Sequence, residues 1–279
     1  MQIIFTDGLG NEMFQYALYL VMRKKGRNPT INCCMISWNQ VHNGFELCDD
    51  FHIDRDNLDI VADGKLIKHI TPLAINRFQR LLCFKENVEV FNPGVFKTRK
   101  PFVKGYWQDE RYFSEVKDEV RQSFRFRGID ERNLALGQEM ENRESVSIHI
   151  RRGDYLKYSF WQVCDPSYFK RAIEYIRSKV ENPFFYVFSD DLEWSADFMK
   201  DTGVDYQIVD HNRGKESYKD MYLMTKCHHN IIANSSFSWW GAWLGDYRDK
   251  IVLRPRGWMK GYKKDPCPAE WICVDTDEL

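Results

Sequence analysis

Short apolar runs alternate with helical patterns along much of this chain. An apolar run at 2–5 is followed by a helical pattern over 11–25 and by a second expected strand over 29–36. Residues 38–100 show only weak periodicity with scattered proline and glycine, and the pattern over 110–143 is typical of a polar helical link between two parts of the chain.

The second half of the chain has a more regular pattern. Apolar runs typical of buried strands lie at 145–150, 184–188, 205–209, 230–233 and 250–253. Helical patterns fall between or beside them at 167–180, 192–200, 217–227 and 236–244. Because strand and helix alternate at short intervals, we expect an α/β fold with a parallel sheet and crossover helices.

Polar clusters follow three of these expected strands. They lie at 151–154, at 189–191 and at 234–236, where the last one also begins a helix. In a parallel sheet, ligands bind beyond the carboxyl ends of the strands, so all three clusters fall on the binding edge. One such cluster is ordinary loop chemistry, but three on one edge favour a binding site.

The residue types in these clusters favour a nucleoside diphosphate. A guanidinium presents a planar fork of donors that suits phosphate, and strand alternation places His149 and Arg151 on one face. Arg152 falls on the other face, where we expect it to pair with a carboxylate. The helix start at 234–236 offers backbone N–H groups to an anion, and Asp190 offers an acceptor to the base.

Each of these features also has an ordinary structural explanation. An isolated arginine pair most often forms surface salt bridges, and serines at a helix start are most often plain N-caps. Trp239, Trp240 and Trp243 have helical spacing, which favours a place in the core over a sugar platform. The string at 152–154 is also an adhesion-type tripeptide, which we interpret as accidental.

Two glycines follow the first expected strand. Gly8 and Gly10 lack the third glycine of a dinucleotide-binding fingerprint, because Met13 stands in its place. They still let a ligand approach the backbone closely, and Asn11 then heads the helix within reach of that ligand.

Composition and charge exclude several protein classes. The 279 residues are 43% hydrophobic and 29% charged, as in soluble globular proteins. Lys and Arg total 40 against 41 acidic residues, so no broad basic field favours nucleic acid as a partner. The eight cysteines form no C-x-x-C pair, so we expect reduced thiols and no metal site.

The start of the chain has no basic signal-peptide region, and no run of ~20 consecutive apolar residues occurs in the sequence. We therefore expect a cytoplasmic protein, with peripheral membrane association left open.

The polar clusters lie inside longer strings that together resemble the α-1,2-fucosyltransferases and, more distantly, other GDP-fucose-dependent enzymes. The strings are DGLGNEMFQYA at 7–17, SIHIRRGDYL at 147–156, FSDDLEW at 188–194 and HHNIIANSSFSWWGAWL at 228–244. The resemblance therefore covers both halves of the chain. Asp7 and Glu12 depart from it, since Gly and Gln are usual there, and His228 stands where Lys is common.

The resemblance implies a GT-B-type fold, with two Rossmann-like lobes whose parallel sheets face a central cleft. We expect an N-terminal lobe over 1–140 on the acceptor side and a C-terminal lobe over 141–279 that binds GDP-fucose. The implied reaction moves L-fucose with inversion to the 2-hydroxyl of a terminal galactose on an oligosaccharide or polysaccharide. No metal or other cofactor is implied.

The resemblance also implies roles for single residues. Arg151 matches an arginine on the β-phosphate, His149 and Asp190 match residues near guanine, and Asn11 matches an asparagine near fucose and diphosphate. The expected donor-binding set is Gly10, Asn11, His149, Arg151, Arg152, Asp190, Asn234, Ser235, Ser236 and Phe237.

The expected chemistry follows from the departing diphosphate. Negative charge grows on it, and Arg151 with the helix start at Ser236 offers fixed donors in place of a metal, each worth about 3 kcal/mol. The acceptor hydroxyl attacks from the opposite face, helped by a general base for which Asp154 and Glu12 are candidates. The expected catalytic set is Arg151, Asp154 and Asn11.

Three other functions compete with this interpretation. One is a GDP-sugar transferase with another donor or linkage, and a second is a non-catalytic carbohydrate-binding or adhesion module. GDP affinity separates these two, because a lectin ignores the nucleotide. The third is a nucleic-acid-binding protein, which the balanced charge already disfavours.

Overall fold

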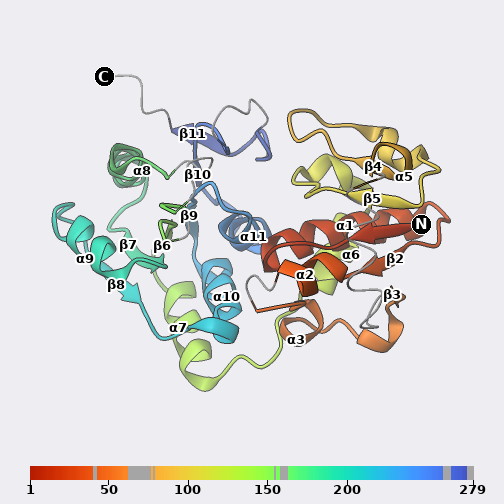
Figure 1. The fold of residues 1–279 in the computed structure, drawn as a ribbon. Coiled ribbons are helices and arrows are strands. Elements are labelled where there is room, and N and C mark those ends of the chain that lie inside the picture. Colours follow the sequence, from red (N-terminus) through yellow and green to blue (C-terminus); the bar gives the residue numbers. More distant parts are fainter. Residues whose placement is uncertain are drawn as a thin grey trace. The chain divides into compact units, whose positions relative to one another are not determined.

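The structure is a computed structural model that describes residues 1–39, 43–61, 77, 79–153, 155–157, 163–259 and 265–274. The chain forms two compact units, Met1–Gly128 and Ile129–Leu279, and each contains a parallel sheet (Figure 1). The lobe boundary expected at 140/141 falls inside helix α7 (Glu131–Glu141), which packs on α10 (Tyr218–Lys226) of the second unit. The expected α/β class with parallel sheets is confirmed.

The first unit has the strand order β3-β2-β1-β5-β4, and every pair is parallel. Its strands are β1 (Gln2–Ile4), β2 (Thr30–Asn32), β3 (Ile60–Val61), β4 (Cys83–Lys85) and β5 (Phe102–Lys104). Its helices are α1 (Leu9–Lys24), α2 (Cys34–Asn39), α3 (Leu47–Asp50), α5 (Gln79–Leu82) and α6 (Lys117–Ser123). Short 3₁₀ turns lie at Arg55–Asn57, Pro93–Lys97, Glu110–Tyr112 and Ser114–Val116.

Two sequence-based expectations for this part of the chain were wrong in detail. The strand predicted over 29–36 stops at Asn32, whose side-chain Oδ1 accepts the N–H of Cys34 at 3.0 Å and so turns the chain into α2. The polar segment 110–143 is divided, since α6 ends at Ser123 and Asp130 caps the start of α7. Residues 62–76 and 78 of the irregular segment lie outside the described residues.

The second unit has the strand order β11-β10-β9-β6-β7-β8, again parallel throughout. Its strands are β6 (Ser145–Ile150), β7 (Phe184–Ser189), β8 (Tyr206–Val209), β9 (His229–Ile231), β10 (Val252–Pro255) and β11 (Ile272–Val274). Its other helices are α8 (Pro166–Lys179), α9 (Leu192–Lys200) and α11 (Ser236–Leu244), with a 3₁₀ turn at Gly214–Glu216. These elements confirm the alternation predicted for 145–253, whereas β11 was not predicted.

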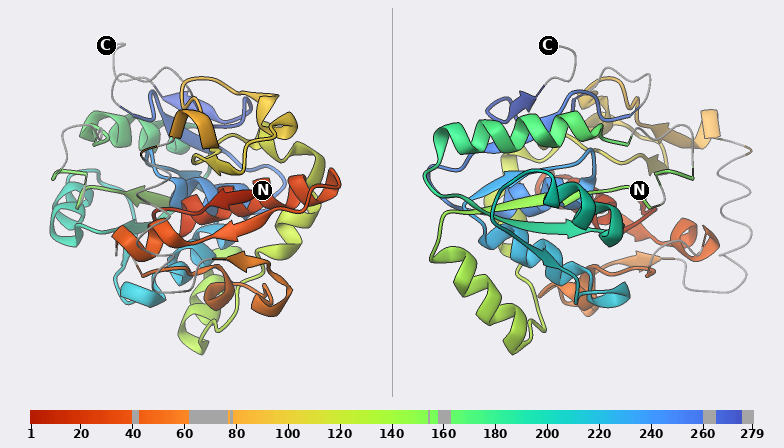
Figure 2. Two further views of the ribbon diagram at one scale, coloured as in Figure 1. Left: turned by 45° about the vertical axis from the view of Figure 1, so that its right-hand side comes forward. Right: turned by 90° about the vertical axis from the view of Figure 1, so that its left-hand side faces the viewer.

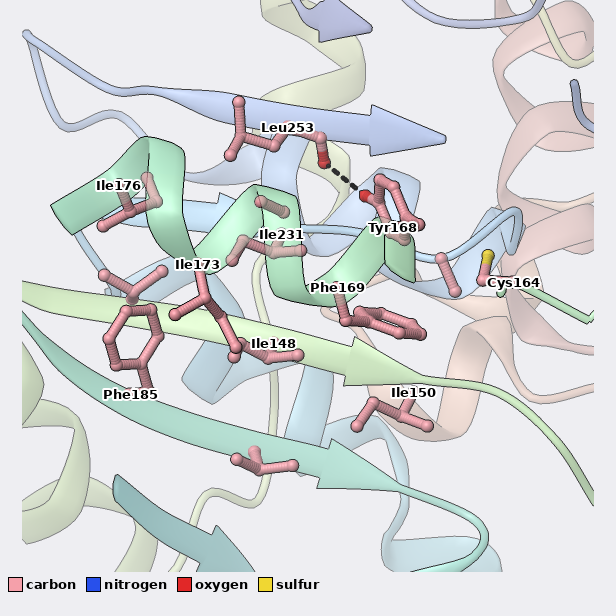
Figure 3. Packing of buried hydrophobic residues seen from close by; sticks show 14 of the residues in the cluster. Ile148, Ile150, Cys164, Tyr168, Phe169, Ile173, Ile176, Phe185, Ile231 and Leu253 are labelled. Carbon is pink, nitrogen blue, oxygen red and sulfur yellow. Dashed lines mark hydrogen bonds between the residues drawn. The ribbon is translucent and has the colours of Figure 1, made fainter. Parts of the chain in front are cut away.

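Side-chain alternation along β6 divides the core of the second unit into two layers. Ile148 and Ile150 pack under α8 and α9, and Figure 3 shows Phe169 and Ile173 of α8 above them. The hydroxyl of Tyr168 also donates to the carbonyl of Leu253 at 3.1 Å (Figure 3). Both views of Figure 2 show α8 along one face of this sheet, opposite α10 and α11. The remaining β6 positions therefore face α7, α10 and α11.

The tryptophans of α11 belong to the core. Trp239 and Trp240 are fully buried and Trp243 is 5% exposed, which confirms the core interpretation over a sugar platform. The indole N–H of Trp239 donates to the carbonyl of Pro266 at 3.2 Å. None of the described helices has both the length and the apolar character that a bilayer crossing requires.

Candidate functional site

The carboxyl ends of β6, β7, β8 and β9 lie on one edge of the second sheet, because these strands are parallel neighbours. Segments 151–153, 189–191, 210–213 and 234–237 leave the sheet there, and we call this edge the second-unit rim. Helices α10 and α11 both begin at this edge, since each follows a strand that ends on it. The rim thus gathers the polar clusters that the sequence pattern placed together.

Arg151 and Asp190 meet at the centre of the second-unit rim. Nη1 of Arg151 lies 3.1 Å from Oδ2 of Asp190, and the two side chains are 27% and 24% exposed. The other carboxylate oxygen of Asp190 accepts the backbone N–H of Arg152 at 2.9 Å. Asp190 therefore ties the end of β7 to the arginine loop that follows β6.

Arg152 points to the opposite side of the sheet, as strand alternation predicted. Its Nε donates to Oδ2 of Asp191 at 3.1 Å, and its guanidinium lies 4.0 Å from the ring centroid of Trp194. Asp191 also caps α9 by accepting the N–H of Trp194 at 3.3 Å. The expected pairing of Arg152 with a carboxylate is confirmed, and these contacts make Arg152 a brace for the loop.

His149 lies in a desolvated position just behind Arg151. It is 7% exposed, and its ring centroid lies 5.8 Å from that of Phe237. Burial, with a smaller contribution from the charge of Arg151, lowers the pKa of His149 to about 3, so the imidazole is neutral. Its Nδ1 is buried and has no hydrogen-bond partner among the described residues. A ligand that supplies such a partner would satisfy this nitrogen.

The start of α11 provides a second feature suited to an anion. Ser235 occupies the N-cap position with extended backbone, yet its side chain makes no capping hydrogen bond. The first-turn N–H groups that follow, from Ser236 onward, thus lack the usual serine cap and can bind an anion.

Asn234 differs from its neighbours, because its side chain bonds to the interior of the protein. Its Nδ2 donates to the carbonyl of Trp258 at 3.0 Å, and its Oδ1 lies 3.3 Å from Sγ of Cys164. Its own carbonyl accepts the hydroxyl of Tyr155 at 3.0 Å. These contacts support a role for Asn234 in shaping the turn before α11.

Asp220 joins the second-unit rim although the sequence pattern did not single it out. It lies in the first turn of α10, and its Oδ1 accepts the side-chain N–H of Asn212 from the segment after β8 at 2.8 Å. Burial raises the pKa of Asp220 to about 7, while Asn212 and the charge of Arg213 oppose the rise. The sequence offers one signal that could have found Asp220: it is an acid in the first turn of a helix that follows the end of a strand.

Asp220 and His149 belong to the same layer of the second unit. His149 pairs in register with Phe188, which pairs with Val209 at the end of β8. Phe188 and Val209 pack with α10 in one cluster, and Phe237 packs against that cluster. Asp220 therefore lies on the α10 side of the sheet, where His149 and Phe237 also lie.

Gly10 and Asn11 lie in the first unit, at the carboxyl end of β1. Asn11 is in the first turn of α1, and its Oδ1 accepts the side-chain N–H of Gln108 at 2.6 Å. Gln15 links the ends of two strands, since it accepts the N–H of Thr6 at 3.0 Å and donates to the carbonyl of Gly105 at 3.1 Å. Contact of Gly10 and Asn11 with the donor stays a prediction.

Glu12 is fully buried, which argues against its candidacy as general base. Its Oε2 accepts the backbone N–H of Glu46 at 3.0 Å, and its Oε1 has no hydrogen-bond partner in the described ranges. Burial raises the pKa of Glu12 well above its usual range, and the carboxylates of Glu46 and Asp50 reinforce this. A carboxyl that keeps its proton inside the core does not take one from an acceptor hydroxyl.

Asp7 occupies a backbone conformation that favours glycine. Its φ is +65°, in the left-handed region that asparagine and aspartate tolerate better than most residues. This conformation gives a physical reason for the glycine that is usual at this position in the resembling enzymes.

Asp154 lies outside the described residues, so its catalytic role stays a prediction. Within the ranges that the structure describes, no group of three or more His, Cys, Asp or Glu side chains has an arrangement that holds a metal ion.

Relatives of this chain are glycosyltransferases. An α-1,2-colitosyltransferase from Escherichia coli is 34% identical over 97% of each chain. The O-antigen biosynthesis glycosyltransferase WbnK from Escherichia coli is 30% identical over 98% of this chain and 99% of its own. The human galactoside α-(1,2)-fucosyltransferase 1 is 28% identical, over 64% of this chain and 54% of its own length.

This chain also resembles solved structures of fucosyltransferases and matches a family profile. NodZ α-1,6-fucosyltransferase soaked with GDP-fucose aligns with TM-score 0.55 at 15% identity, over 87% of this chain and 92% of its own. An Arabidopsis thaliana FUT1 variant in complex with GDP aligns with TM-score 0.54 at 11% identity, over 91% and 70%. These likenesses confirm a GT-B-like fold. The sequence profile described as Glycosyl transferase family 11 matches residues 1–274, so this chain belongs to that family of glycosyltransferases.

Proposed function

We propose that this chain transfers L-fucose from GDP-fucose, with inversion, to the 2-hydroxyl of a terminal galactose on a glycan. The observation that carries the proposal is that Arg151 and the uncapped start of α11 lie on the same edge of the second sheet. Fixed cationic and amide donors on one edge match the two phosphates of a nucleoside diphosphate.

In this proposal the diphosphate lies between Arg151 and the first turn of α11. The planar guanidinium of Arg151 presents several N–H donors, and in this proposal the phosphate oxygens accept from this fork beside Asp190. The N–H groups from Ser236 onward add fixed dipoles that need no reorganisation when charge develops. The same groups support a reaction without a metal cofactor, which is part of the proposal.

We assign the guanine base to the layer that holds His149, Phe237 and Asp220. Guanine presents N–H donors on its Watson–Crick edge, and the desolvated carboxylate of Asp220 is the acceptor that such donors best satisfy. The neutral imidazole of His149 adds the unpaired Nδ1. Asp190, which the sequence pattern placed near the base, already binds Arg151 and the N–H of Arg152.

The chemical step breaks the bond between the anomeric carbon and the oxygen of the β-phosphate. The electron pair leaves with that oxygen, where Arg151 and the α11 amides stabilise the charge. The acceptor hydroxyl attacks the opposite face of the sugar and loses its proton to a base. We retain Asp154 for that base, on the sequence resemblance alone, and Asn11 as a contact to the donor.

Colitose is a second candidate for the transferred sugar. The 34% identity to an α-1,2-colitosyltransferase over 97% of the chain favours it. Fucose and colitose differ in one hydroxyl, at carbon 3, so a donor site that bonds this hydroxyl selects fucose strongly, whereas an apolar contact there admits colitose.

The acceptor in this proposal is a galactose-terminated oligosaccharide or polysaccharide. The name of the human relative, a galactoside fucosyltransferase, supports galactose, and the O-antigen role in the name of WbnK supports a surface polysaccharide. We assign acceptor binding to the first unit.

The test incubates the purified chain with GDP-fucose or GDP-colitose, a panel of galactose-terminated acceptors, and EDTA. NMR of the product should show an α-1,2 linkage, with turnover unchanged by the chelator. Arg177→Ala, a change on the exposed side of α8, is the matched control and should keep full activity. A β linkage, attachment to another hydroxyl, or loss of turnover that Mg²⁺ restores would contradict the proposal.

A further inference from the structure

Asp190 is engaged on both of its carboxylate oxygens by the arginine loop. Oδ2 lies 3.1 Å from Nη1 of Arg151, and Oδ1 accepts the N–H of Arg152 at 2.9 Å. We propose that Asp190 is a positioning residue that holds the Arg151 guanidinium in the direction of the leaving diphosphate. This inference rests on the proposed function and assigns a role inside that same site.

Gly153 is the residue that makes this arrangement possible. A Cβ atom at position 153 would lie 2.8 Å from Oδ2 of Asp190, which is closer than Cβ atoms approach in proteins, and 3.2 Å from its Cγ, which is a tight contact. The backbone of Gly153 does not have a positive φ, so glycine is needed here for space and not for backbone freedom. A larger side chain at position 153 therefore forces the Asp190 carboxylate to shift from its present place beside Arg151.

The loop has a second anchor that does not involve Asp190. Arg152 is held between Oδ2 of Asp191 at 3.1 Å and the ring of Trp194 at 4.0 Å. Asp191 is in turn fixed at the N-cap of α9. Removing the Asp190 carboxylate therefore leaves the loop attached, while the Arg151 guanidinium loses the ion pair that directs it and keeps its contact with the Tyr155 ring, 5.7 Å from the ring centroid.

A positioning role and a base-binding role predict opposite kinetic effects. Without Asp190, Arg151 keeps its charge, so it still attracts the diphosphate of the bound donor. The nearby negative charge is also gone, so GDP binds equally well or more tightly. The loss falls on the transition state, because a misplaced guanidinium no longer meets the developing charge. A residue that binds guanine would instead weaken GDP binding directly.

The experiment measures kcat and KM for the GDP-sugar donor and the Kd for GDP in Asp190→Asn. We expect kcat to fall by about tenfold to a hundredfold, with the Kd for GDP within about threefold of the parent value. Gly153→Ala should reproduce this result, since it displaces the same carboxylate. Asp197→Asn on α9, where the side chain is 70% exposed, is the matched control and should change neither quantity.

A tenfold or greater rise in Kd for GDP with kcat unchanged would overturn the inference in favour of a base-binding role. Unchanged kinetics in both variants would overturn it as well. The Nε–H NMR signal of Arg151 gives a readout without turnover, and it should lose its separate shift in Asp190→Asn. If the parent chain transfers no sugar, the proposed function fails, whereas this signal still tests whether Asp190 orients Arg151.

Discussion

Two carboxyl groups near the carboxyl ends of strands, Asp190 after β7 and Glu12 in the helix after β1, have opposite surroundings. Asp190, on the second-unit rim, is partly exposed and ion-paired with Arg151. Glu12, in the first turn of α1, is fully buried, and burial raises its pKa well above the usual range. The sequence alone presents both as charged candidates for the site. The comparison teaches that a carboxyl beside a cation and solvent remains available at the surface, whereas desolvation makes a carboxyl inside the core a structural acid.

The largest effect is expected when the Arg151 guanidinium, the cation beside Asp190, is removed from the second-unit rim. Arg151→Ala should lower kcat/KM by more than about a hundredfold, because it deletes a donor aimed at the leaving group. Circular dichroism and the melting temperature should match the parent chain, since Arg151 is a partly exposed side chain. Turnover within tenfold of the parent would refute the leaving-group role.

Asp220 sharpens the comparison, because it is more buried than the ion-paired Asp190, yet it lies on the second-unit rim and not in the core as Glu12 does. The pKa of Asp220 is raised to about 7 by burial, and the ionised form, with two acceptor oxygens and a negative charge, binds guanine N–H donors much more strongly than the protonated form. GDP affinity should therefore rise by about tenfold between pH 6 and pH 8, as the ionised fraction grows through the pKa. Calorimetry with the parent chain and Asp220→Asn separates this effect from titration of the nucleotide.

The Asp220→Asn variant should bind GDP about tenfold to a hundredfold more weakly at pH 8, with a flatter pH dependence. Asp197→Asn, exposed on α9 and outside the second-unit rim, is the matched control. A steep pH dependence that persists in Asp220→Asn would remove Asp220 from the base site.

Glu12 offers a test through stability. A group whose pKa is higher in the folded than in the unfolded state stabilises the fold at low pH, and this contribution is lost as pH rises toward the folded value. Glu12→Gln replaces the buried acid by a neutral side chain that keeps the acceptor for the N–H of Glu46. We expect a gain of about 1 kcal/mol at pH 8 and almost none near pH 4.

Chemical denaturation at both pH values measures this difference. Glu12→Asp serves as the contrasting variant, because it keeps the acid and shortens its reach. Equal stability of Glu12→Gln and the parent chain at pH 8 would mean that Glu12 is ionised in the folded protein.

The smallest expected effect concerns Asp7 at the first-unit edge. Its φ of +65° costs less for glycine, so Asp7→Gly should stabilise the fold by about 0.5 kcal/mol, after the entropy that glycine adds to the unfolded chain. Asp7→Ala should have the opposite sign, because alanine avoids this conformation. Destabilisation by glycine would show that the Asp7 side chain contributes more than its backbone strain costs.

Much of the second unit was predictable from the sequence, because apolar runs and strand ends are local signals. The pattern around β6 placed His149 and Arg151 on one face, and the contact of Arg152 with Asp191 confirms its expected partner type. Asp220 was missed because the packing of α10, not the spacing in the sequence, brings it to the rim. The burial of Glu12 was missed for the same reason, since its neighbours Glu46 and Asp50 come from a distant segment.

In the first unit the prediction was weaker. Strands β3, β4 and β5 are each too short to show side-chain alternation, so the sequence around them had no clear period. The pairing of Asn11 with Gln108 joins residues far apart in the chain, which no local pattern reveals.

A crystal structure of the chain with GDP bound tests the central claim most directly. We predict the β-phosphate within hydrogen-bond distance of the Arg151 guanidinium and of the first N–H groups of α11, with guanine against Asp220 and His149. A nucleotide bound away from the second-unit rim, or a divalent ion bridging its two phosphates, would contradict the account.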